Sequence, residues 1–256
     1  AVNAPSASQP PSEQQQCGDG FRYARFGPGS ERSSTMFVGG GDGVVAKLTM
    51  PDHTQPHLAV VALVTLPEPC TSISDMGNGE LIAATRSGSI HAVRFENKRG
   101  AVRHLSDAMT VMSTVITAHP TQFHVFVTGS KDGLLRQWEL NTYNIAGVYE
   151  MPAERTSKAT NASAKVPVCS GLSISDGLEV LLSTWSDGSV RCFDMTNFKF
   201  LWSHANAHRS ALTSLVVSPA MKYFVTGSSE GEIRVWDIRT RELKTELSDQ
   251  KQDIVR

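Results

Sequence analysis

The chain of 256 residues is 40% apolar and 19% charged, which is typical of a globular protein and excludes a largely disordered one. Its formal net charge is −1, so it lacks the basic excess that favours nucleic acid or an acidic membrane as the main partner. The apolar run from Leu58 to Leu66 has the length of a strand and falls short of the ~20 residues of a membrane-spanning helix. Composition and charge therefore predict a globular protein that binds neither nucleic acid nor a membrane.

The first 33 residues differ in composition from the remainder of the chain. They are rich in Pro, Ser, Gln and Gly, as linkers and tails are, and they lack the basic and apolar regions of a secretory signal. We therefore predict a linker or tail over residues 1–33. The alternative is that Cys17 to Phe26 supplies a turn and a strand to a partial unit of the fold.

From residue 34 onward one unit recurs five times, and Tyr223–Asp237 is its most regular copy. In each copy an alternating strand leads into a tight turn with a glycine, and a second alternating strand follows. Gly provides the positive φ of such a turn without steric cost, and period-two alternation separates the side chains onto two faces. The turn glycines, 45, 45, 55 and 43 residues apart, are Gly43, Gly88, Gly133, Gly188 and Gly231.

The stretches between these units hold further strands, for example at Leu58–Leu66 and Ser210–Ser218. Each period of ~45 residues therefore contains four strands, which is the period of a β-propeller blade. The long spacing of 55 residues has its cause in a polar insertion between two blades, Pro152 to Lys165. We predict an all-β propeller over residues 34–256, with at least five blades, as part of a seven-bladed or double propeller.

An apolar or aromatic residue follows each turn glycine by five positions: Leu48, Val93, Trp138, Phe193 and Trp236. At Trp236-Asp237, preceded by Ala207-His208 and Ser218-Pro219, the chain resembles the WD40-repeat family. The resemblance implies a buried polar network in some blades, with Glu230 in place of the usual Asp. The residues it assigns to these networks are His208, Thr226, Glu230 and Trp236 in the fifth unit, Asp132 and Trp138 in the third, and Asp187 with Phe193 in the fourth. The second unit has Ser87 and Val93 and lacks the network.

Three longer segments are similar to the cilia- and flagella-associated WD-repeat family of the doublet-microtubule wall. They are Ser183–Asp194, Leu201–Leu215 and Val225–Leu247, and a weaker similarity reaches back to Met36–Gly43. This resemblance implies two propellers in a longer protein. It also implies a structural component of the ciliary or flagellar axoneme that lies in the microtubule lumen and contacts tubulin and neighbouring luminal proteins.

Three residues near the turns are candidates for contact with a partner. Trp185 begins a turn, where an aromatic side chain either packs on the next blade or is exposed as a binding anchor. Arg86 and Lys131 take comparable places in neighbouring blades, and Pro152 to Lys165 adds a loop on that rim. A merely solvated rim is the alternative interpretation.

The four cysteines, Cys17, Cys70, Cys169 and Cys192, are far apart and form no C-x-x-C pair. We therefore expect free, mostly buried thiols in a reducing compartment, the cytoplasm, with disulfides as the alternative.

No motif in the sequence indicates catalysis, a cofactor or a metal. Gly39–Gly43 is not followed by the Lys-Ser or Lys-Thr of a phosphate-binding loop. His53 and His57 are four apart, as are His204 and His208, but no third ligand stands at a suitable spacing. We therefore predict a non-catalytic scaffold without a cofactor. The alternatives are an adaptor subunit of another cytosolic or nuclear complex, and a propeller that binds or converts a small molecule in its channel.

Overall fold

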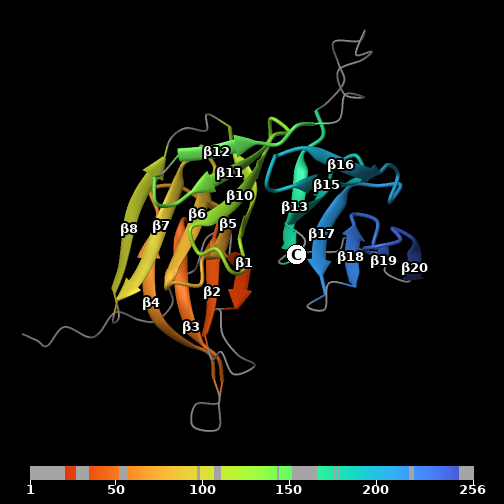
Figure 1. Ribbon diagram of the computed structural model, residues 1–256. Helices are drawn as coiled ribbons and strands as arrows, with labels where there is room; N and C mark the ends of the chain where they lie inside the picture. Colours follow the sequence, from red (N-terminus) through yellow and green to blue (C-terminus); the bar gives the residue numbers. More distant parts are fainter. Residues whose placement is uncertain are drawn as a thin grey trace, which may run out of the picture.

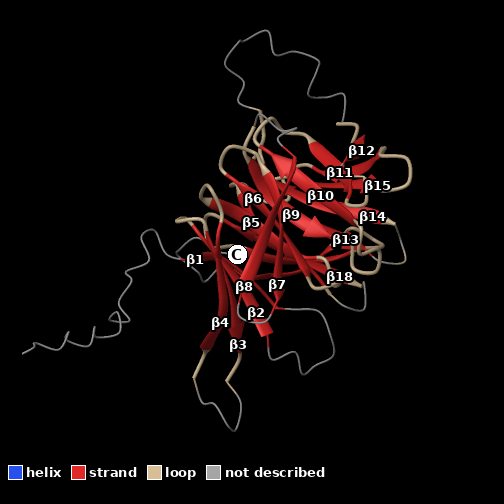
Figure 2. Ribbon diagram, turned by 90° about the vertical axis from the view of Figure 1, so that its left-hand side faces the viewer, coloured by secondary structure: helices blue, strands red, loops and turns tan. Residues whose placement is uncertain are grey.

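The computed structural model describes residues 21–26, 35–51, 57–96, 99–106, 111–142, 144–151, 166–175, 177, 179–218 and 222–247. Every regular element in these residues is a β-strand (Figure 2). No helix in this described part is long and apolar enough to cross a membrane.

The strands form five groups of four, which follow one another along the chain as blades (Figure 1). Blade 1 contains β1 (Phe21–Phe26), β2 (Thr35–Gly40), β3 (Val44–Thr49) and β4 (Ala59–Thr65). Blade 2 contains β5 (Cys70–Asp75), β6 (Glu80–Thr85), β7 (Ile90–Glu96) and β8 (Arg99–Ser106). Blade 3 contains β9 (Ser113–Ala118), β10 (Val125–Ser130), β11 (Leu135–Glu139) and β12 (Asn144–Val148). Blade 4 contains β13 (Cys169–Ser175), β14 (Val180–Trp185), β15 (Val190–Asp194) and β16 (Phe200–His204). Blade 5 contains β17 (Leu212–Val217), β18 (Tyr223–Ser228), β19 (Ile233–Asp237) and β20 (Leu243–Leu247).

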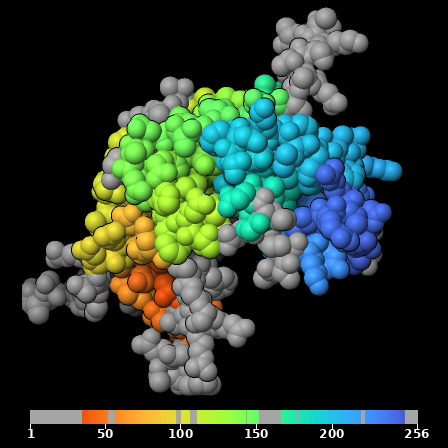
Figure 3. Space-filling view, viewed as in Figure 1, coloured from red at the N-terminus to blue at the C-terminus, as the bar shows by residue number. Residues whose placement is uncertain are grey.

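Each blade is an antiparallel sheet whose strands pair in chain order. The first strands of successive blades, β1, β5, β9, β13 and β17, are neighbours in space, so they form the inner ends of the blades. The outer strands of blades 1 and 2 also meet, through one parallel pair between Leu63 on β4 and Arg99 on β8. The surfaces of blades 3, 4 and 5 follow one another from green through cyan to blue in Figure 3. The predicted all-β propeller with five four-stranded blades is confirmed.

The first strand, β1, lies inside the stretch predicted as a tail or a partial unit, and it pairs with β2 over Phe21–Phe26. The insertion at 152–165 lies outside the described residues. The domain boundaries themselves stay a prediction.

The five turn glycines have the positive φ that the sequence pattern requires, between 76° and 99°. At two of them the next inter-blade loop also passes very close. A Cβ on Gly188 would lie 2.3 Å from the carbonyl oxygen of His208, and one on Gly43 would lie 2.8 Å from that of Glu68. Glycine at these turns therefore serves both the turn and the packing of the loop that leads into the next blade.

The core lies in layers between successive blades, because alternation along each strand gives every blade two apolar faces. Blades 2 and 3 bury Phe126 and Trp138, whose rings stack with centroids 5.9 Å apart. Blades 4 and 5 bury Phe224 and Trp236, which stack at 6.0 Å. Burying one such large side chain contributes roughly 1.5–3 kcal/mol, so the inter-blade layers supply much of the stability.

Cys70, Cys169 and Cys192 are free and buried, and Cys17 lies outside the described residues. Burial raises the pKa of the Cys70 and Cys192 thiols to about 12. These two thiols are therefore protonated at neutral pH and act as small core residues rather than as nucleophiles.

Candidate interaction site

The turn between the second and third strands of blade 5 stands over a chain of hydrogen bonds. Trp236 Nε1 donates to Thr226 Oγ1 (2.9 Å), and this hydroxyl lies 2.8 Å from His208 Nε2. The other ring nitrogen, His208 Nδ1, lies 3.2 Å from Glu232 Oε2. Since a carboxylate only accepts, Nδ1 carries the proton and donates to Glu232, and Nε2 accepts from Thr226. Every member of the network is thus satisfied with a neutral imidazole.

His208 is 1% exposed. Burial lowers its pKa from the ordinary value of 6.5, and the positive charge of Arg234 lowers it further, although Glu232 opposes both effects. The lowered pKa favours the neutral imidazole, which is the form in this order of hydrogen bonds.

The acid in this network is Glu232, not Glu230 as the sequence pattern predicted. Glu230 is exposed at the tip of the turn, and Glu232 is the first residue after the turn glycine, where it also lies 3.5 Å from Arg234. In blade 3 the residue before the turn glycine is Asp132, whose short side chain accepts from Leu134 N two residues on (3.0 Å). Glu is one methylene longer, and at Glu230 the side chain turns to solvent instead.

In blade 3 the predicted Asp132 and Trp138 belong to two separate clusters. Asp132 pairs with Arg136 (2.6 Å) and accepts from Ser130 Oγ (2.5 Å). Burial alone would raise the pKa of Asp132, but these hydrogen bonds and the charge of Arg136 hold it below the ordinary value. Trp138 Nε1 donates to Thr128 Oγ1 (2.9 Å), as Trp236 does to Thr226 in blade 5.

In blade 4 the predicted Asp187 accepts from Ser189 Oγ (2.6 Å) and pairs with Arg191 (2.5 Å). Burial would raise the pKa of Asp187, but Ser189 and Arg191 together hold it below its ordinary value. Phe193, at the place of the tryptophan, is 0% exposed and carries no donor for a network.

Trp185 is not an exposed binding anchor. It is packed, in the layer between blades 3 and 4 and not on the following blade 5. Its side chain is 0% exposed, Nε1 donates to Ser183 Oγ (2.8 Å), and the guanidinium of Arg191 lies 4.4 Å from its ring centroid. Trp185 is the last residue of β14 and stands one position before the places of Arg86 and Lys131. Because successive side chains of a strand point to opposite faces, this shift of one residue turns Trp185 inward.

Arg86 and Lys131 are exposed, and the structure brings them together. Each directly follows the second strand of its blade, and each backbone N–H is held by the preceding loop, at Pro69 O and Met112 O, both 3.0 Å away. The two side chains line one pocket of about 390 Å³. The other lining residues are Gly41, Pro69, Cys70, Thr71 and Met112.

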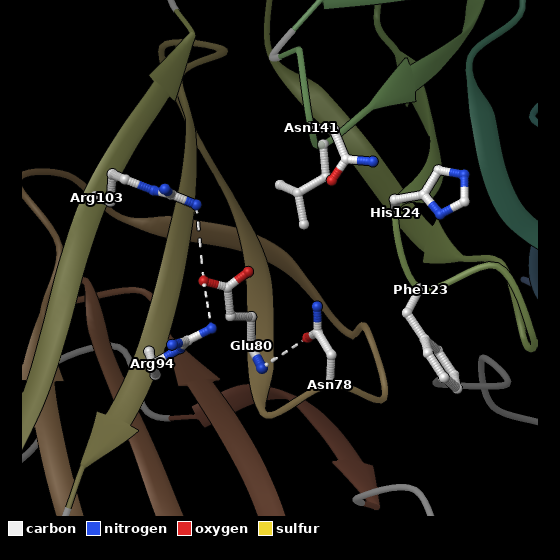
Figure 4. Close-up of a pocket in the computed structure, with 8 residues that line it drawn as sticks. Asn78, Glu80, Arg94, Arg103, Phe123, His124 and Asn141 are labelled. Atoms are coloured by element: carbon white, nitrogen blue, oxygen red, sulfur yellow. Dashed lines mark hydrogen bonds and ion pairs between the residues drawn. The ribbon is translucent and has the colours of Figure 1, made fainter.

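A second pocket of about 480 Å³ lies between blades 2 and 3, at the opposite ends of the strands (Figure 4). Glu80 on β6 lies 3.2 Å from Arg94 on β7 and 3.6 Å from Arg103 on β8. Figure 4 shows His124 and Phe123 across the pocket from this cluster. Sequence reasoning missed this site, because no local spacing joins residues from two blades. Its only signal is the pairing of Glu80 with Arg94 in adjacent strands.

Within the described ranges no group of three or more His, Cys, Asp or Glu side chains could hold a metal ion. His204 packs on the Trp236 ring, with centroids 4.6 Å apart, and His53 lies outside those ranges. The absence of a catalytic set and of a cofactor stays a prediction.

Comparison with known protein families finds a match in the region of the blade 5 network. Residues 199–237 match the family described as "WD domain, G-beta repeat". The chain contains a WD40 repeat. The match runs from β16 to β19 and includes His208, Thr226 and Trp236, so the hydrogen-bonded network lies inside the WD40 repeat. The other four blades also have four antiparallel strands that pair in chain order, so the fold is consistent with a WD40-type β-propeller.

Several relatives match longer stretches of the chain than this repeat. "Cilia- and flagella-associated protein 52" of Bos taurus is 23% identical over 222 residues, which is 86% of this chain and 32% of that protein. The human protein of the same name is 30% identical over 88 residues, 34% of this chain and 14% of that protein. "Target of rapamycin complex 1 subunit mip1" of Schizosaccharomyces pombe is 26% identical over 132 residues, 52% of this chain and 9% of that protein. The chain thus spans about a third of the length of its bovine relative.

Proposed function

We propose that this protein is a non-catalytic scaffold of cilia or flagella. In this proposal its propeller lines the doublet microtubules of the axoneme and contacts tubulin and neighbouring luminal proteins. The observation that carries the proposal is the similarity to cilia- and flagella-associated protein 52, which extends over 86% of this chain.

The construction of the blades supports a scaffold. Several polar groups under the turns of blades 3, 4 and 5 are engaged within the protein: Trp138 and Trp236 donate to threonine hydroxyls, and Arg136 and Arg191 pair with aspartates. Groups engaged in this way are not free to act on a substrate, but they fix the loops that they join. A rigid ring that displays fixed turns is suited to binding other proteins over broad faces.

Localisation tests the proposal. The full-length protein, tagged and expressed at its native level in ciliated cells, is expected along the axoneme and to remain there after detergent removes the membrane and soluble protein. A subtomogram average of doublet microtubules is then expected to lose a luminal density when the protein is deleted. A diffuse cytosolic or nuclear signal would contradict the proposal, and so would density on the outer surface of the doublet.

The same experiment separates the second candidate, an adaptor subunit in another cytosolic or nuclear complex. The similarity to the Schizosaccharomyces pombe complex subunit over 52% of the chain favours this alternative. It predicts a signal away from the axoneme, and recovery of the tagged protein in a soluble complex after detergent extraction.

A further inference from the structure

Two cations stand at one turn position in adjacent blades. Arg86 and Lys131 each lie two residues before the turn glycine of their blade, in blades 2 and 3. The same position holds the uncharged residues Gly41, Ser186 and Ser229 in the other three blades. The net charge of the whole chain is −1, so this pair of positive charges is a local feature and not part of a basic surface.

Arg86 and Lys131 differ in their ion pairing from the arginines that follow the turns. Arg136, Arg191 and Arg234 each pair with a carboxylate. In the described part of the chain, no ion pair engages the side chain of Arg86 or Lys131. Glu68 approaches the Arg86 turn, but its Oε2 accepts a hydrogen bond from Ser87 N (3.0 Å).

The remaining polar groups of the pocket between the two cations are satisfied by the protein itself. Thr71 Oγ1 donates to Ala84 O (3.2 Å), and Cys70 Sγ donates to Ser72 O (3.6 Å). Pro69 and Met112 add apolar walls. The side-chain donors that remain for a ligand are therefore the guanidinium of Arg86 and the ammonium of Lys131. The volume of about 390 Å³ falls within the range of ~300–1,000 Å³ that is typical of ligand pockets.

The two side chains also start from fixed positions. Gly88 N donates to Thr85 O (3.1 Å) and Gly133 N to Ser130 O (3.0 Å), so both turns are closed by backbone hydrogen bonds. The loops before blades 2 and 3 hold Arg86 N and Lys131 N from the other side. A ligand that binds here has to order two side-chain ends and no backbone, which keeps the entropic cost of binding low.

We propose that this pocket binds a carboxylate side chain from an acidic segment of a partner protein. The carboxylate lies between Arg86 and Lys131, and its aliphatic stem lies against Pro69 and Met112. The stem favours a glutamate-rich segment over a compact inorganic anion. The inference rests on the proposed function only in treating the propeller as a protein-binding scaffold.

Fluorescence anisotropy of a dye-labelled hexaglutamate peptide with the full-length protein tests this. Binding is expected to weaken as salt rises from 0.05 to 0.5 M, because screening acts on exposed charges such as these two. Arg86→Gln and Lys131→Gln are each expected to weaken binding about threefold, and the double variant about tenfold.

Arg209→Gln is the matched control, because Arg209 is exposed in the loop before blade 5, at the same end of the strands, and does not line the pocket. It is expected to leave the affinity unchanged, and the charge-conserving pair Arg86→Lys with Lys131→Arg is expected to retain most of it. A hexaglutamine peptide is expected not to bind.

Three results would overturn the inference: equal loss with Arg209→Gln, unchanged affinity in the double glutamine variant, or equal affinity for hexaglutamine. Preference for a phosphoserine peptide over hexaglutamate would also overturn it, by assigning the pocket to phosphate. Failure here leaves axonemal localisation intact, whereas a protein that binds hexaglutamate through this pocket but lies away from the axoneme would contradict only the proposed function.

Discussion

Blades 5 and 2 have the same strand order but different chemistry beneath the same turn. In blade 5, His208, Thr226 and Trp236 form the hydrogen-bonded network. Counting from the turn glycines and the first strands, the corresponding residues of blade 2 are Leu66, Ala83 and Val93. All three are buried in one apolar cluster.

The backbone geometry around these two sets of residues is shared. His208 N donates to the carbonyl of Gly188 (3.0 Å), the turn glycine of the blade before it, and Leu66 N donates in the same way to Gly43 O (2.9 Å). An apolar trio leaves no donor or acceptor to satisfy, and a polar network satisfies all of its own. The comparison teaches that blades 2 and 5 share the turn glycine and the loop hydrogen bond. Beneath the turn, either a polar network or an apolar cluster can pack.

The largest expected effect comes from the aromatic residue of blade 5. Trp236→Ala removes a side chain that is 3% exposed and stacks on Phe224, and it is expected to lower the free energy of unfolding by about 3–5 kcal/mol. Val93→Ala at the matched place of blade 2 is expected to cost only about 2 kcal/mol. Urea unfolding followed by circular dichroism measures both. Equal costs would show that blade 5 does not depend on its tryptophan more than blade 2 depends on its valine.

The next effect concerns the hydroxyl at the centre of the network. Thr226→Val keeps the shape but leaves Trp236 Nε1 and His208 Nε2 without their partner, at an expected cost of about 2–4 kcal/mol. Thr245→Val on the exposed strand β20 is the control and is expected to change stability by less than about 0.5 kcal/mol.

A triple variant sharpens the comparison further. Making blade 5 apolar with His208→Leu, Thr226→Val and Trp236→Phe removes the donors and acceptors together. It is expected to destabilise by less than the sum of the three single changes, because no buried polar group is left alone. A cost equal to that sum would mean that the single changes are costly for the hydrogen bonds they remove. It would contradict the idea that they are costly because they leave a buried polar group without a partner.

The sequence could predict those features that depend on counting along a strand. The turn glycines predicted five blades. The resemblance to the WD40-repeat family assigned Thr226 and Trp236 to one network, and a hydrogen bond joins them in the structure. The same counting, applied strictly, would have turned Trp185 inward, since it stands at the place of Ser130 and not of Lys131.

Two features could not be obtained by counting. The first is that Glu232, and not Glu230, lies beside His208. Which of the two carboxylates reaches the imidazole depends on side-chain rotamers and packing at the turn, and not on sequence spacing. The cluster of Glu80 with Arg94 and Arg103 needs the registers of β6 with β7 and of β7 with β8, and its pocket needs blade 3 as well.

The smallest expected effect is the pH dependence contributed by His208 of blade 5, whose counterpart in blade 2, Leu66, has no titratable group. The folded protein holds the pKa of His208 below 6.5, so acidification protonates this residue more readily in the unfolded chain. Its contribution to stability is therefore complete above pH ~6.5 and is lost as the pH falls toward the folded pKa, by at most about 1.4 kcal/mol per pH unit. His208→Leu, which copies Leu66 of blade 2, is expected to remove that part of the slope when urea midpoints are compared between pH 7.5 and 5.5. His57→Leu, at an exposed position, is the control and should leave the slope in place. An unchanged slope in His208→Leu would mean that groups other than His208 set the acid sensitivity.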